Sequence, residues 1–79
     1  MSPTVFRQNE YRGFFFSREE ARPHVHVACS DGEAKFWMDP SIELSTSHGY
    51  SRKDLARIEA IVRKHEHVIR ATWDRHFAR

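Results

Sequence analysis

The chain has 79 residues, a net charge of +2 and 39% apolar residues, a size at which one small domain buries only about 60% of its unfolded surface. It has no apolar run near the ~20 residues that span a membrane and no basic-then-apolar signal segment, so we expect neither a membrane protein nor a secreted one. The single cysteine, Cys29, excludes an internal disulfide and is typical of a reducing compartment. We therefore expect residues 1–79 to form one cytoplasmic domain.

Residues 4–46 are expected to form a small, mostly antiparallel sheet of four or five short strands. The segments that are β-prone by composition or alternation are Thr4–Arg7, Tyr11–Phe16, His24–Cys29, Glu33–Met38 and Ile42–Thr46. Asp31-Gly32 is a strong signal for a two-residue hairpin turn. Asp39-Pro40 ends the fourth segment, because proline cannot donate a hydrogen bond to a strand ladder.

A hairpin with Asp31-Gly32 at its tip predicts which side chains lie opposite each other. Val27 is then placed opposite Phe36, and His26 opposite Trp37. Because side chains alternate between the two faces of a strand, one face of this hairpin is apolar and belongs to the core. Both imidazoles of the His-Val-His-Val segment are expected on the other, open face.

Residues 51–78 are predicted to form one long helix. Ser51 and Asp54 have the spacing of a capping box, and no glycine or proline follows them. The apolar stripe at helical spacing comprises Leu55, Ile58, Val62, Ile69 and Trp73. Such a helix is about 40 Å long, whereas a five-residue strand spans about 17 Å.

The excess length leaves three interpretations: the helix overhangs the sheet, breaks near 65–67, or packs against a second copy. An overhang used for self-association or for a partner is the favoured one. The expected fold is thus α+β, with the helix across one sheet face. The core side chains expected on that face are Val25, Val27, Phe36, Ile42 and Leu44.

The two histidines of the third strand are the first candidates for chemistry. His24 and His26 lie about 6–7 Å apart along one strand face and could serve as two imidazole ligands of a divalent metal. A metal-free ribonuclease is the alternative, with the histidines as general acid and base and Lys35 stabilising the phosphate. In that interpretation Trp37 stacks a base, and His48 could supply the second histidine.

A binding surface on the same face is the third interpretation, because exposed aromatic surface on a small domain usually marks an interface. Its candidate residues are Trp37, Asp39, Glu19 and His48. Residues 51–79 also hold 8 basic and 4 acidic side chains, and one helix stripe has few acidic neighbours. That stripe comprises Lys53, Arg57, Lys64 and Arg75, and it could bind phosphates of a nucleic acid or an acidic partner.

Several segments together resemble a small bacterial family catalogued as domain-of-unknown-function family 4160. They are Phe14-Phe15-Phe16-Ser17, His24-Val25-His26-Val27, Glu33-Ala34-Lys35-Phe36-Trp37, Asp39-Pro40, Ile42-Glu43-Leu44, Gly49-Tyr50-Ser51 and the Trp73…Phe77 pattern. The resemblance implies one member of a two-gene module similar to a toxin–antitoxin pair. We therefore expect a binding component whose partner is a small protein encoded next to it, a second copy of the chain, or both.

Overall fold

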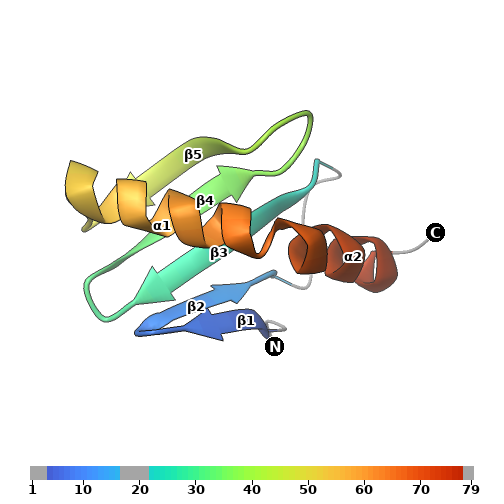
Figure 1. Cartoon of the computed structure of the whole chain (residues 1–79), viewed down its shortest axis with the longest axis horizontal. Coiled ribbons are helices and arrows are strands. Elements are labelled where there is room, and N and C mark those ends of the chain that lie inside the picture. Colours follow the sequence, from blue (N-terminus) through green and yellow to red (C-terminus); the bar gives the residue numbers. More distant parts are fainter. Residues whose placement is uncertain (1–3, 17–21, 78–79) are drawn as a thin grey trace.

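The computed structural model describes residues 4–16 and 22–77 and has the expected α+β architecture (Figure 1). A five-stranded antiparallel sheet, in the order β1-β2-β3-β4-β5, is followed by two helices that lie across one of its faces. The strands are β1 (Thr4–Gln8), β2 (Tyr11–Phe14), β3 (His24–Cys29), β4 (Gly32–Trp37) and β5 (Glu43–His48). The helices are α1 (Arg52–Lys64) and α2 (Glu66–His76). Within the described part of the chain, neither helix is long and apolar enough to cross a membrane.

The core lies between the sheet and the helices. Alternate residues of β3 and β4 point into it, and Val25, Val27 and Phe36 are at most 1% exposed. Helix α1 contributes Ile58 and helix α2 contributes Ile69, both fully buried. The apolar alternation of the strands therefore predicted the buried face correctly.

The predicted pairing of β3 with β4 is wrong by two residues. Cys29 lies opposite Gly32 and Val25 lies opposite Phe36, so the turn has Ser30-Asp31 at its tip. A Cβ atom on Gly32 would overlap the carbonyl oxygen of His48. The close approach of the end of β5 to this turn therefore requires a glycine here. A shift of two residues leaves every side chain on its predicted face, because the strand repeat is also two.

Strand β5 begins one residue later and ends two residues later than predicted, and it forms an edge of the sheet. Ile42, just before it, is buried as expected, at 6% exposure. Leu44 is 42% exposed, so its predicted place in the core is wrong. The pairing of β5 with β4 shifts between Lys35 and Phe36, as in a β-bulge. As an edge strand, β5 has a neighbouring strand on one side only.

The predicted single C-terminal helix is also wrong, because it breaks at His65, within the segment named as the alternative. The His65 ring stacks on Phe6, with centroids 4.4 Å apart and planes 6° apart. Its Nε2 donates a hydrogen bond of 2.9 Å to Oε1 of Gln8. These contacts tie the junction between the helices to β1. Beyond the junction, α2 runs on past the ends of β1 and β2 (Figure 1).

Protonation of His65 should destabilise the fold. Burial, and secondarily the charge of Lys64, lower the pKa of His65 from its ordinary 6.5. The unfolded chain therefore binds a proton at a higher pH than the folded chain, and this contribution to stability is lost as the pH falls below about 6.5. In urea unfolding at pH 7.5 and 5.0, we expect a smaller pH difference for His65→Gln than for the wild type. Equal pH differences would contradict this assignment.

The capping box at the start of α1 is present as predicted. Ser51 Oγ accepts from the Asp54 backbone N–H and Asp54 Oδ2 accepts from the Ser51 N–H, each at 3.1 Å. These bonds also lower the pKa of Asp54. We expect Ser51→Ala to reduce the free energy of unfolding by about 1 kcal/mol, measured by urea denaturation. The control is Ser47→Ala on the exposed edge strand, which should change it by less than about 0.5 kcal/mol.

Candidate functional site: the terminal cleft

His24 was expected on an open face, but the structure corrects this, because the residue is 0% exposed. Its ring lies at the start of β3, with centroids 5.1 Å from Trp73 of α2 and 5.7 Å from Trp37 of β4. Its Nδ1 donates a hydrogen bond of 2.7 Å to the carbonyl oxygen of Arg22. The imidazole is therefore held in one orientation between the sheet and α2.

His26 is also covered, at 7% exposure, which corrects the second half of that prediction. The ring of Phe14 stacks on it at 5.5 Å, and that of Phe16 approaches edge-on at 4.4 Å. Its Nδ1 lies 3.4 Å from a carboxylate oxygen of Glu33. The sheet face opposite the helices thus carries a layer of aromatic rings.

Basic side chains lie over the rings of this layer. The Arg22 guanidinium lies 4.1 Å from a ring centroid of Trp37, and Lys35 Nζ lies 4.3 Å from a ring centroid of the same tryptophan. Arg12 lies 4.6 Å over Phe14 in the same way. Such cation–π pairs are favourable, and they occupy the ring surface of Trp37 on which a base was predicted to stack. Sequence analysis missed both arginines, although the spacing of Arg12 and Phe14 on one strand face was a usable signal.

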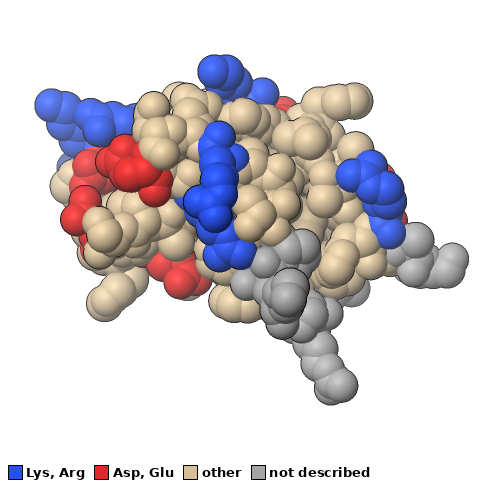
Figure 2. Space-filling view, turned by 90° about the horizontal axis from the view of Figure 1, so that it is seen from below, with Lys and Arg blue, Asp and Glu red and all other residues tan. Residues whose placement is uncertain are grey.

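Of the remaining predicted residues, Lys35 and His48 come together with His26, whereas the four basic helix residues do not join them. His48 lines a separate open hollow of about 340 Å³ together with His26 and Lys35. The four basic helix residues, Lys53, Arg57, Lys64 and Arg75, are all exposed. On the side of the molecule that Figure 2 shows, Lys and Arg side chains stand in separate groups rather than in one continuous field. Glu19 lies outside the described residues.

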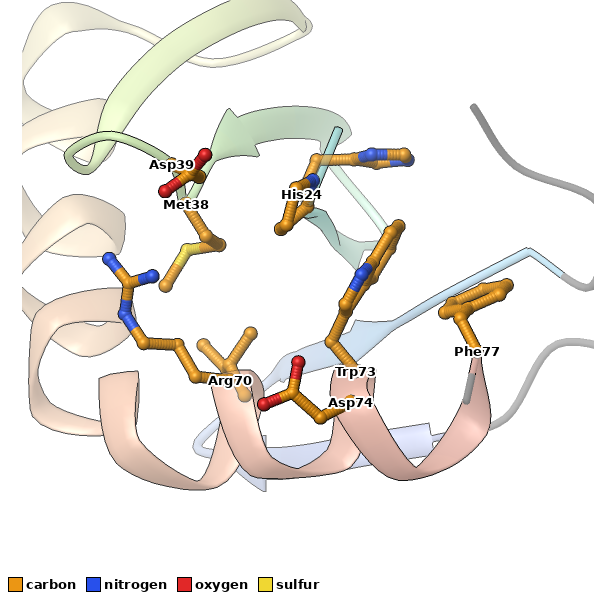
Figure 3. Close-up of a pocket in the computed structure, with 9 residues that line it drawn as sticks. His24, Met38, Asp39, Arg70, Trp73, Asp74 and Phe77 are labelled. Carbon is orange, nitrogen blue, oxygen red and sulfur yellow. The ribbon is translucent and has the colours of Figure 1, made fainter. Parts of the chain in front are cut away.

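The structure instead forms a cleft of about 510 Å³ between α2 and the adjoining ends of β3 and β4 (Figure 3). We call it the terminal cleft. Its lining residues are Pro23, His24, Met38, Asp39, Ile69, Arg70, Trp73, Asp74 and Phe77. Of the predicted site residues, it brings together His24 and Asp39.

The terminal cleft has an apolar floor and a charged rim. Met38, Ile69 and Trp73 form the floor and are each at most 5% exposed. Asp39 and Asp74 are exposed and lie on opposite sides of the opening (Figure 3). This combination of buried apolar surface and a few polar groups is typical of binding pockets.

Sequence analysis missed the α2 side of the cleft. Ile69, Trp73 and Phe77 recur every four residues, and the sequence pattern assigns them only to the core stripe and to the family motif. Arg70 and Asp74 directly follow Ile69 and Trp73 and are also four residues apart. They therefore flank the apolar residues at the surface of the helix. Their role became visible only when α2 was placed beside β3.

The metal prediction finds no third ligand. Within residues 4–16 and 22–77, no three His, Cys, Asp or Glu side chains are grouped so that they could hold a metal ion. The rings of His24 and His26 meet edge to face, with centroids 5.2 Å apart.

Comparison with known proteins identifies the family. Residues 11–74 match the family described as Domain of unknown function (DUF4160), and the chain belongs to it. The match spans β2 to α2, and so it includes every residue of the terminal cleft except Phe77. No curated protein and no solved structure matches the chain.

Proposed function

We propose that this member of the family acts as a binding module, and that the terminal cleft is where it receives a partner protein. The observation that carries the proposal is the contrast between the cleft and the histidines. The cleft is open beside α2, whereas His24 and His26 are at most 7% exposed. A binding module needs an accessible, shaped surface, and the cleft is a surface of that kind.

The ribonuclease alternative is less well supported by this geometry. A general acid and a general base must each come within hydrogen-bond reach of the substrate, on opposite sides of the phosphate. His24 is enclosed between two tryptophans, and His26 lies under Phe14 and Phe16. Both rings border a hollow but offer little surface to a phosphate, since His24 is 0% exposed and His26 is 7% exposed.

The proposed partner is a small protein encoded next to this chain. This part of the proposal rests on the resemblance to two-gene modules of the toxin–antitoxin type, and the cleft is where we place the contact. A partner that covers the cleft would also bury the exposed carboxylates of its rim. Reversing the charge at the rim should therefore weaken the complex without disturbing the core.

Co-purification tests this proposal. The tagged chain is expressed together with the product of the adjacent gene, and captured partner is measured per mole of chain. We expect stoichiometric capture by the wild type and at least a tenfold loss for Asp39→Lys/Asp74→Lys. The matched control is Glu10→Lys, an exposed carboxylate in the β1–β2 turn at the opposite end of the sheet (Figure 1). Absence of capture by the wild type, or an equal loss in the control, would overturn the proposal.

Expression of the chain alone separates binding from nuclease activity. If the protein is a binding module, cultures that express the wild type and His24→Ala/His26→Ala should retain the same cellular RNA profile. RNA degradation by the wild type that the double variant abolishes would favour the ribonuclease alternative instead.

A further inference from the structure

The chemistry of the terminal cleft points to the kind of group it receives. We infer that it binds an arginine side chain of the partner protein, with the guanidinium between Asp39 and Asp74 and the aliphatic stem on the apolar floor. This inference rests on the proposed function, because it specifies what the partner inserts. The argument uses the charge balance of the rim, the composition of the floor and the geometry of a guanidinium.

The rim of the cleft carries an uncompensated negative charge. Neither Asp39 nor Asp74 has a salt bridge within the part of the chain that the structure describes. Among the described lining residues the one cation of the rim is Arg70, whose Nε lies 2.9 Å from the carboxylate of Glu66, so its charge is matched on its own helix. A positively charged ligand is therefore the complementary one.

The other arginine close to the cleft is engaged on the opposite sheet face. Arg22 places its guanidinium over Trp37, and its Nε donates a hydrogen bond of 2.9 Å to the backbone carbonyl of Asp39. That contact fixes the Asp39 backbone and does not involve the Asp39 carboxylate, which lies at the rim of the cleft. In Figure 3 the two rim carboxylates lie on either side of an opening that the side chains of Met38, Arg70 and Trp73 also border.

An arginine matches both parts of this site better than a lysine or a small metal ion. Its planar guanidinium has five N–H donors and can bond two carboxylates at once, whereas an ammonium is a compact point charge. Its methylene stem can pack on Met38 and Ile69, and its planar guanidinium can pack on the aromatic ring of Trp73. A bare metal ion would gain nothing from the apolar floor.

Binding of a capped amino acid to the whole protein tests the inference. The probes are Nα-acetyl-arginine amide and its neutral analogue Nα-acetyl-citrulline amide, titrated into isotope-labelled protein and followed by NMR. A single side chain is expected to bind with Kd of about 1–10 mM. The Trp73 indole signal should move with the arginine probe, while the Trp37 indole signal, on the other sheet face, serves as the internal control.

The rim variants show whether the carboxylates are responsible. We expect Asp39→Asn and Asp74→Asn each to weaken binding about threefold, and the double variant about tenfold. Asp31→Asn, an exposed turn residue, is the matched control and should leave Kd unchanged. No saturable shift at Trp73, equal binding of the citrulline probe, or tighter binding of free agmatine than of the capped arginine would each overturn the inference.

The two proposals can fail separately. If the charge-reversed rim abolishes partner capture but the arginine probe does not bind, the partner uses the cleft through another group. If the probe binds in an Asp-dependent way but the adjacent gene product is not captured, the arginine site stands and the proposed partner is wrong.

Discussion

Replacing Trp73 with alanine is expected to remove a large part of the stability of this protein. The indole is 5% exposed and contacts three rings, with centroids 4.2 Å from Phe77, 5.1 Å from His24 and 5.2 Å from Phe15. Deleting a buried tryptophan costs about 3–5 kcal/mol. A domain of this length has a total stability of about 4–12 kcal/mol, so Trp73→Ala should lose at least about a quarter of it, and all of it at the lower end of that range.

The measurement is urea unfolding followed by far-UV circular dichroism, with Trp37→Ala as the matched control. Trp37 is the other tryptophan of the chain, and it lies half-buried on the sheet face opposite the helices. We expect its removal to cost less than about 2 kcal/mol, because it leaves no enclosed cavity. Equal losses for the two variants would show that α2 does not close the core as described.

Replacing Gly49 with alanine is expected to have the second-largest effect. Gly49 has φ of +86°, a backbone conformation that costs a residue with a Cβ about 1–3 kcal/mol. Its Cβ would also overlap the carbonyl oxygen of Asp31, so the end of β5 would have to move away from the β3–β4 turn. Overpacking of this kind adds about 1–3 kcal/mol, and we expect a total loss of about 2–5 kcal/mol.

Asn9→Ala is the control for Gly49→Ala at the other position with a positive φ. Asn9 also has a positive φ, of 56°, but it lies in the exposed β1–β2 turn. Because Asn9 already has a Cβ atom, this control adds neither a new Cβ nor an overlap, and we expect a loss of less than about 1 kcal/mol. If thermal and urea unfolding give the same loss for both variants, the close approach of Gly49 to the β3–β4 turn is not a constraint on the fold.

The covered histidines illustrate how far alternation alone can be taken. The His-Val-His-Val pattern correctly predicted that the valines and the histidines lie on opposite faces of β3, because the strand repeat is two. It could not show that the second face is covered as well. That cover comes from Phe14, Phe16 and Trp73, which lie between 10 and 49 residues along the chain from the histidine that each contacts.

Local features of the chain were determined by the sequence itself. The α+β class, the buried face of the hairpin and the Ser51 capping box follow from patterns within a few residues, where side-chain chemistry and backbone geometry are directly coupled. The capping box needs only Ser51 and Asp54, three residues apart, and its hydrogen bonds form wherever the helix begins.

Only the tertiary structure decided the features that join distant segments. The hairpin register depends on the fit of Gly32 against the end of β5, and the helix break depends on the contact of His65 with Phe6, 59 residues earlier. The terminal cleft combines residues 23–39 with residues 69–77. Such contacts arise from packing between elements that no local pattern records, and for this protein they place the proposed binding site.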